Sequence, residues 1–232
     1  MIQAEGLHKK FGAPVAVEEV SFTARDGCVT ALLGPNGAGK TTSLRMLYGL
    51  LRPDGGRAVI DGRLGVLPDA NGLYARLTAR EHLVYAARLQ GLAAAEASRR
   101  AGDLIEKLDM RGIADRPAAG FSQGERRKIA LGRALIHDPR NVVLDEPTNG
   151  LDVPSTRAMR RHVRELAESG KCVLFSTHIL QEVAAVCDRV VILARGRVVA
   201  EGTPADLLAR TGRDQLEDAF VQLIGTEEGL GA

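Results

Sequence analysis

The stretch GPNGAGKTT, residues 34–42, follows the apolar run CVTALL (28–33) and precedes a helical pattern that ends near Leu50. It matches G-x-x-x-x-G-K-[ST] in the strand–loop–helix context that makes this pattern specific. Its glycines allow a tight turn whose backbone N–H groups point at phosphate oxygens. Lys40 supplies a cation for the β- and γ-phosphates, and Thr41 can ligate Mg²⁺. The nucleotide-binding residues that we predict here are Gly34, Pro35, Asn36, Gly37, Ala38, Gly39, Lys40, Thr41 and Thr42.

A second apolar run, NVVLDE (141–146), ends in two acidic residues. Ligands gather at the carboxyl ends of parallel strands, so both carboxylates are expected near the phosphate loop. We predict that Asp145 holds Mg²⁺, directly or through water, and that Glu146 orients or deprotonates the attacking water. The alternative for this pair is a helix-capping acid after a strand.

His178 follows the strand-like run KCVLFS (171–176) in the sequence FSTH. Its place after a neighbouring core strand predicts a hydrogen bond to the γ-phosphate or to the attacking water. A lone histidine more often has a structural role, and that alternative stays open at this point.

The order of strand and helix patterns predicts an α/β fold with a mostly parallel sheet, a small antiparallel β subdomain near the start of the chain and a helical insertion. Residues 78–137 are rich in Ala, Arg and Leu and are predicted to be helical, apart from a loop near 116–120. One or two further helices are expected within 204–224. The expected core strands after the insertion are residues 141–145, 171–176 and 189–194, with helices at about 154–169 and 178–187.

The composition of the chain excludes several classes of function. Among 232 residues, 31 are basic and 29 acidic, and this near-neutral balance predicts no nucleic-acid partner. The three cysteines are far apart and form no C-x-x-C pair, which argues against a zinc site or a disulfide framework. No apolar run has the length of a membrane span, so we expect a membrane role only through a partner.

The stretch FSQGERRKIALGRAL (121–135) predicts a helix that begins with a capping box formed by Ser122 and Glu125. Three cations, at positions 126–128, crowd its first turns, although the helix dipole favours anions there. An external anion close to this helix start would explain them, and so would solvent exposure.

Taken together and in this order, these motifs resemble the ATP-binding subunits of ATP-binding cassette (ABC) transporters, over nearly the whole chain. GPNGAGKTT resembles the Walker A loop, VVLDE the Walker B strand, NGLD (149–152) the D-loop and FSQGE the signature motif. His178 corresponds to the switch histidine. The stretches EPTNGLDV, STHILQEVAAVCDRVVILARGRVVAEGTP and LEDAFVQLIGTEEGL look like the sodium-extruding branch of the ABC-2-type exporters.

The resemblance implies a P-loop NTPase core and ATP and Mg²⁺ as cofactors. It also implies a head-to-tail pair with a second copy or a homologous cassette, in which each ATP lies between a Walker A loop and the opposite signature. A separate integral-membrane permease would dock near residues 70–92, including Tyr74 and Glu81, which places the chain on the cytoplasmic face of the membrane. Further nucleotide-contacting residues that it implies are Phe11, Val17, Ser122, Gln123, Gly124, Glu125 and Asp152.

Three features depart from the family pattern. Gln123 replaces the usual first glycine of the signature, and Glu125 replaces its glutamine. Asp69 stands where the Q-loop glutamine is expected, as a shorter, anionic residue that reaches Mg²⁺ at most through water. The stretch 57–67 looks short for the antiparallel subdomain, which either trims a loop or shifts the Q-loop.

The resemblance predicts one ABC ATPase domain over residues 1–232. Its predicted parts are a catalytic core with the antiparallel subdomain (1–68 and 138–203), a helical subdomain with the signature (69–137) and a C-terminal helical tail (204–232). Two other functions remain open. Asp69 and the short 57–67 stretch suggest a weakly hydrolysing regulatory cassette. A soluble ABC ATPase acting on ribosomes or DNA is disfavoured by the single cassette and the near-neutral charge.

Overall fold

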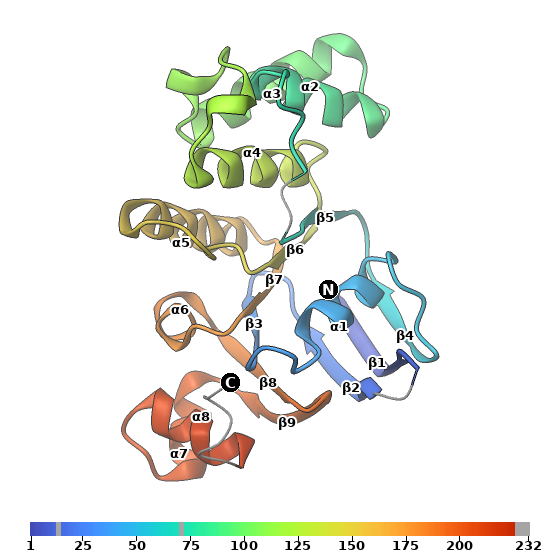
Figure 1. Cartoon of the computed structure of the whole chain (residues 1–232), viewed down its shortest axis with the longest axis vertical. Helices are drawn as coiled ribbons and strands as arrows, with labels where there is room; N and C mark the ends of the chain where they lie inside the picture. Colours follow the sequence, from blue (N-terminus) through green and yellow to red (C-terminus); the bar gives the residue numbers. More distant parts are fainter. Residues whose placement is uncertain (13–14, 70–71, 226–232) are drawn as a thin grey trace.

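A six-stranded sheet in the order β5-β6-β7-β3-β8-β9 forms the centre of the computed structural model, which describes residues 1–12, 15–69 and 72–225 (Figure 1). Five neighbouring strands run parallel, and β9 pairs antiparallel with β8. The strands are β3 (Val29–Leu33), β5 (Leu64–Leu67), β6 (Asn141–Asp145), β7 (Cys172–Thr177), β8 (Arg189–Ala194) and β9 (Arg197–Gly202). Every residue of β3, β6 and β7 is buried, as their continuous apolar sequences predict.

A smaller antiparallel sheet with the order β2-β1-β4 lies beside the main sheet, as predicted. Its strands are β1 (Ile2–Lys10), β2 (Val15–Ala24) and β4 (Gly55–Ile60), and its core is shared with the helix α1 (Lys40–Leu47). Only three residues connect β4 to β5, and β5 then pairs with β6 from Leu64 opposite Asn141. The short 57–67 stretch therefore still forms the strand that leads to Asp69, and this strand is part of the main sheet.

The helical insertion contains α2 (Ala79–Leu89), α3 (Ala94–Lys107) and α4 (Gln123–Leu135), which stand together at one end of the molecule (Figure 1). The predicted loop near 116–120 includes a short 3₁₀ turn, Ala118–Gly120. The remaining helices are α5 (Val153–Glu168), α6 (Leu180–Val186), α7 (Pro204–Thr211) and α8 (Leu216–Ile224). Of the helices in the described ranges, none combines the length and the apolar character that a bilayer crossing requires.

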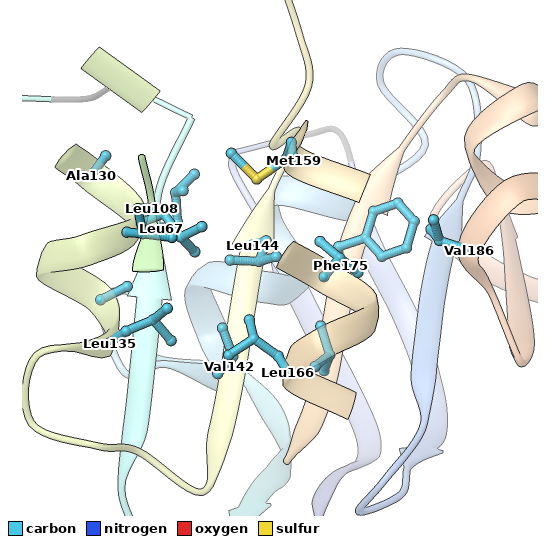
Figure 2. Packing of buried hydrophobic residues seen from close by; sticks show 14 of the residues in the cluster. Leu67, Leu108, Ala130, Leu135, Val142, Leu144, Met159, Leu166, Phe175 and Val186 are labelled. Atoms are coloured by element: carbon cyan, nitrogen blue, oxygen red, sulfur yellow. The ribbon is translucent and has the colours of Figure 1, made fainter. Parts of the chain in front are cut away.

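The main hydrophobic core joins the sheet to the helices around it. Leu144 and Phe175, on the neighbouring strands β6 and β7, lie over Met159 and Leu166 of α5 (Figure 2). Leu135 of α4 belongs to the same cluster, so the helical insertion shares one core with the sheet. This packing fixes the carboxyl ends of β6 and β7 relative to the start of α4.

Candidate nucleotide-binding and catalytic site

A cavity of about 590 Å³ opens at the carboxyl ends of β3, β6 and β7, where the sequence predicts the phosphate site. It brings together the phosphate loop, the acidic residues after β6 and the histidine after β7. The lining residues are Phe11, Ala16, Asn36, Gly37, Ala38, Gly39, Lys40, Thr41, Thr42, Asp69, Glu146, Asn149 and His178.

The start of α1 faces this cavity without a side-chain cap. Gly39 precedes the helix in the left-handed conformation (φ 99°), and a Cβ there would lie 2.6 Å from the carbonyl oxygen of Ala16. Glycine is therefore required on both conformational and steric grounds. The first N–H groups of a helix have no partner within the helix, and its dipole is positive at this end. The uncapped start of α1 is thus suited to an anion such as phosphate.

The Lys40 side chain is only 6% exposed and lies among oxygen atoms. Its Nζ donates hydrogen bonds to the carbonyl oxygens of Gly34 (2.7 Å) and Pro35 (3.1 Å) and lies 3.5 Å from Oε1 of Glu146. Burial lowers the pKa of Lys40, while the nearby Glu146 carboxylate opposes that shift. The ammonium group is therefore placed at the phosphate loop with a negative charge beside it.

Oxygen atoms suited to Mg²⁺ meet next to Lys40. Oδ1 of Asp145 accepts hydrogen bonds from Ser176 Oγ (2.6 Å) and Thr41 Oγ1 (3.3 Å). Burial raises the pKa of Asp145, because a carboxylate in this position lacks water. In the described part of the chain no group of three or more His, Cys, Asp or Glu forms a protein-only metal cage. One carboxylate and one hydroxyl fit Mg²⁺, which takes its other ligands from phosphate and water.

Glu146 and His178 form a pair at the mouth of the cavity. Oε2 of Glu146 lies 3.0 Å from Nδ1 of His178. The backbone of Glu146 has a φ of 47°, in the left-handed region that non-glycine residues rarely adopt. Its N–H donates to Ser176 Oγ (3.0 Å), which holds the turn against β7. A carboxylate and an imidazole side by side can orient a water molecule and accept its proton.

The family model for "ABC transporter" matches residues 17–149 of this chain, from β2 to the turn after Glu146. The chain belongs to the ABC transporter family. It is 42% identical over 219 residues to the ABC transporter ATP-binding protein NatA of Bacillus subtilis, an alignment that covers 89% of each protein. It is 38% identical over 220 residues to the Nod factor export ATP-binding protein I of Ralstonia nicotianae, covering 90% of this chain and 68% of the relative.

A solved structure described as the ATP-binding subunit of an ABC transporter has the same fold. It superposes with a TM-score of 0.87 at 32% identity, over 96% of this chain and 99% of the other. The predicted α/β fold class is thereby confirmed, and the chain is an ATP-hydrolysing cassette of this family.

The two residues predicted on the adenine side of the cassette have different surroundings. Phe11 lines the cavity and is 51% exposed, and Nζ of Lys9 lies 5.8 Å from the centroid of its ring. Val17 is fully buried in the core below the antiparallel sheet, and Ala16 lines the cavity instead. Val17 was predicted to contact the nucleotide, but its side chain faces the core and has no exposed surface in this structure.

Asp69 lies in the cavity lining of the cassette, just beyond β5. Its side chain is 57% exposed, and Oδ1 lies 3.8 Å from Nη2 of Arg127. Asp69 is thus in the cavity lining with Arg127 as its ion-pair partner, and its predicted contact with Mg²⁺ through water stays a prediction.

The signature residues of the cassette do not line its own cavity. Ser122 and Glu125 form the predicted capping box at the start of α4: each side chain binds the other residue's N–H, at 3.2 Å and 2.7 Å. Gln123 and Gly124 form the first turn of that helix. Asp152 caps α5, accepting from the N–H of Ser155 (2.8 Å).

The three cations after the signature all have partners inside the cassette. Arg126 donates to the carbonyl oxygen of Phe121 and Lys128 to that of Asp109, each at 3.1 Å. Arg127 is buried and donates to carbonyl oxygens of other segments. The explanation of these cations by an external anion was therefore unnecessary, because backbone oxygens already surround them.

Sequence reasoning assigned no role in this site to four residues that shape it, although it named Asn149 in the D-loop and Arg127 among the cations after the signature. Ala16 and Asn149 line the cavity, Ser176 bonds both acidic residues, and Arg127 reaches the backbone of Glu146. The burial of Arg127 could have been inferred from the sequence. It is spaced three, four and seven residues from Ala130, Leu131 and Ala134 of α4, so it lies on the apolar stripe of its helix, where a charged residue needs partners.

Proposed function

We propose that this cassette binds ATP with Mg²⁺ in the 590 Å³ cavity and hydrolyses it to power export through a separate membrane permease. The observation that carries the proposal is the pairing of Glu146 with His178, 3.0 Å apart, at a cavity that also holds Lys40. A base, an orienting imidazole and a phosphate-binding cation are the groups that attack of water on a γ-phosphate requires.

Different groups of the chain bind the phosphates, accept the proton and orient the attacking water. The N–H groups at the start of α1 and the Lys40 ammonium bind the phosphates, in place of the carbonyl and carboxylate contacts that Lys40 now makes. Glu146 accepts the proton of the attacking water, and His178 orients that water or the γ-phosphate. Thr41 and Asp145, with Asp69 through water, would hold Mg²⁺, which would supply positive charge to offset the charge that develops on the phosphates.

The signature supports a head-to-tail pair of cassettes. Ser122, Gln123, Gly124 and Glu125 lie at the start of α4, and neither they nor Asp152 line the cavity of their own chain. In our proposal they contact the ATP held by a second copy or a homologous cassette, and Phe11 stacks on the adenine. In this proposal, residues 1–232 form one cassette with the three parts predicted from the sequence.

The exposed face of α2 supports a docking site for the permease. Tyr74 and Tyr85 are exposed and form an edge-to-face pair with ring centroids 5.8 Å apart, and Leu89 is exposed on the same helix. Beside Leu89, a cavity of about 180 Å³ opens between β5, α2 and α4. Aromatic and apolar side chains next to a hollow are typical of protein interfaces. A cassette docked there lies on the cytoplasmic face of the membrane.

The direction of transport and the cargo rest on resemblance. The relative from Ralstonia nicotianae is described as a protein of Nod factor export, which supports an exporter. Sodium as cargo rests on the sequence resemblance of the D-loop and tail stretches, and residues 226–230 of that tail lie outside the described residues. Sodium efflux from vesicles that contain the cassette and its permease tests this finer proposal.

The substitution Glu146→Gln tests the proposed chemistry. It removes the base while keeping the size of the side chain, so phosphate release from Mg²⁺ and ATP should fall by about 10²- to 10⁴-fold. Nucleotide affinity should persist, and gel filtration with ATP should show an accumulated dimer. Glu168→Gln, an exposed residue at the end of α5, is the matched control. Undiminished hydrolysis in the Glu146→Gln protein would show that another group is the base.

A further inference from the structure

Arg127 joins three segments of the cassette from a buried position. Its side chain is 1% exposed, and its guanidinium leaves its own helix to bind carbonyl oxygens elsewhere. Nη1 donates to the carbonyl oxygens of Pro68 (3.3 Å) and Asp69 (3.1 Å), directly after β5. Nη2 donates to the carbonyl oxygen of Glu146 (3.1 Å), directly after β6. One side chain of α4 therefore fixes the ends of two neighbouring strands.

The contact with Glu146 falls on a strained turn. Its φ of 47° costs energy in a non-glycine residue and persists only where the surroundings hold it. Two hydrogen bonds do so: the N–H of Glu146 donates to Ser176 Oγ from the sheet side, and the carbonyl oxygen accepts from Arg127. The direction of the Glu146 carboxylate toward His178 depends on this backbone conformation.

The charge of Arg127 is balanced by the residue that departs from the family pattern. A buried guanidinium is costly without a negative partner, and Asp69 supplies one at 3.8 Å. Burial lowers the pKa of Arg127, and the carboxylates of Asp69, Asp145 and Glu146 oppose that shift. A neutral glutamine at position 69 would lack this compensation.

We propose that Arg127 is a positioning residue for hydrolysis, which holds the Glu146 turn in its active conformation with Asp69 as its counter-charge. This inference rests on the proposed function of Glu146. It gives the helical subdomain a direct connection to the chemistry, since a shift of α4 moves the donor that fixes Glu146. Arg127 touches neither the nucleotide cavity nor the reacting atoms and acts through the backbone of Glu146.

Steady-state hydrolysis by Arg127→Met and Arg127→Lys tests this role. Both should lower kcat for ATP by about 10²-fold with KM unchanged, because a small misplacement of a reacting group has an effect of this size. Lysine keeps the charge, but one ammonium does not reproduce the planar fork that spans three carbonyl oxygens. Asp69→Asn should lower kcat less, since the hydrogen bonds remain. Rates are measured well below the Tm of each variant.

Arg100→Met is the matched control, because Arg100 donates to a carboxylate and to the carbonyl oxygen of Ile136 within the same subdomain, away from Glu146. Its kcat should equal that of the wild type. Equal losses of kcat in the Arg127 and Arg100 variants, or an unchanged kcat in Arg127→Lys, would overturn the inference. Arg127→Lys decides the matter alone if Arg127→Met does not fold.

A thermodynamic cycle tests the same contact without ATP. Glycine adopts a φ of 47° freely, so Glu146→Gly removes the strain that Arg127 holds. In the wild type, loss of Arg127 lets the turn relax, and the strain energy that is released partly offsets the lost hydrogen bond. Arg127→Met should therefore lower Tm less in the wild type than in the Glu146→Gly protein, and additive changes would overturn the inference. A wild-type protein that hydrolyses no ATP would refute the proposed function alone, because this cycle does not depend on hydrolysis.

Discussion

The N-termini of α1 and α4 both lie at the proposed ATP sites, yet the two N-termini are capped in opposite ways. Gly39, at the start of α1, offers no side-chain cap, and no acidic residue lies in the first turn. Ser122, at the start of α4, caps the helix, and Glu125 completes the capping box with a negative charge. The start of α1 has unsatisfied N–H groups for an external anion, whereas at the start of α4 the N–H groups of Ser122 and Glu125 already have side-chain partners.

The contrast shows that a capping box by itself does not indicate a binding site. The same arrangement occurs at α2 with Thr78 and Glu81 and at α7 with Thr203 and Asp206, both outside the cavity. What distinguishes α4 is its sequence context and its resemblance to the signature of the family. In our proposal, the phosphate held by the partner meets a helix start that already carries an anion, and this side of the site is expected to bind more weakly.

The largest effect is expected at the N-terminus of α1, where Lys40→Met should weaken ATP binding. Loss of a charge-assisted hydrogen bond to phosphate should weaken ATP binding by about 10- to 100-fold in isothermal titration calorimetry. Lys171→Met is the control, because Lys171 likewise bonds a carboxylate and a carbonyl oxygen, those of Asp138 and Pro139. Unchanged affinity in Lys40→Met would mean that the N–H groups of α1 hold the phosphates without this cation.

A smaller effect is expected at the N-terminus of α4, where Ser122→Ala should lower both Tm and ATP-dependent dimerisation. Removal of an N-cap costs about 1 kcal/mol, so Tm without nucleotide should fall by about 2–4 °C. Thr203→Ala removes the equivalent cap of α7 and should lower Tm similarly. Only Ser122→Ala should also reduce ATP-dependent dimerisation, measured by light scattering. Equal dimerisation in both variants would place the Ser122 hydroxyl outside the site.

The smallest effect is expected from Glu125→Gln, and it should be a gain. Glutamine also completes a capping box, so Tm should hardly change, while the negative charge at the helix start disappears. The ATP concentration for half-maximal dimerisation should then fall by about twofold to fivefold. Glu106→Gln, in the same subdomain, controls for net charge. A rise in that concentration would show that the Glu125 carboxylate assists binding.

The sequence predicts the residues of this site better than it predicts their contacts. Lys40, Glu146 and His178 were predicted because each follows a recognisable strand, and strand ends of a parallel sheet meet at one edge. The choice between Ala16 and Val17 depends on which face of β2 is buried, which a single strand without regular alternation does not reveal. The place of Arg127 on the apolar stripe of α4 indicates burial, but its partners depend on the distance between α4 and two strand ends, which is a tertiary property.

The secondary structure was likewise predicted where the local sequence determines it and missed where tertiary contacts do. The core strands carry continuous apolar sequences and were predicted nearly to the residue, such as 141–145 and 189–194. β9 (Arg197–Gly202) was not predicted, because its sequence RVVAEG shows only a weak alternation of apolar and polar residues and its pairing with β8 supplies the stabilisation. The end of α1 at Leu47 instead of near Leu50 has a similar cause, since helix ends depend on local contacts.

Gly124 has a steric requirement within its own chain. A Cβ at this position would lie 2.5 Å from Oγ of Ser155, because α4 and α5 approach closely there. A larger residue at 124 therefore displaces the Ser155 hydroxyl and crowds the Ser155 Cβ, which would lie 3.2 Å away, whether or not a nucleotide is present. Loss of activity in a Gly124 variant is thus ambiguous evidence for a phosphate contact, and a Ser155→Gly background, which removes the obstructing hydroxyl, separates the misfit between helices from the loss of a ligand.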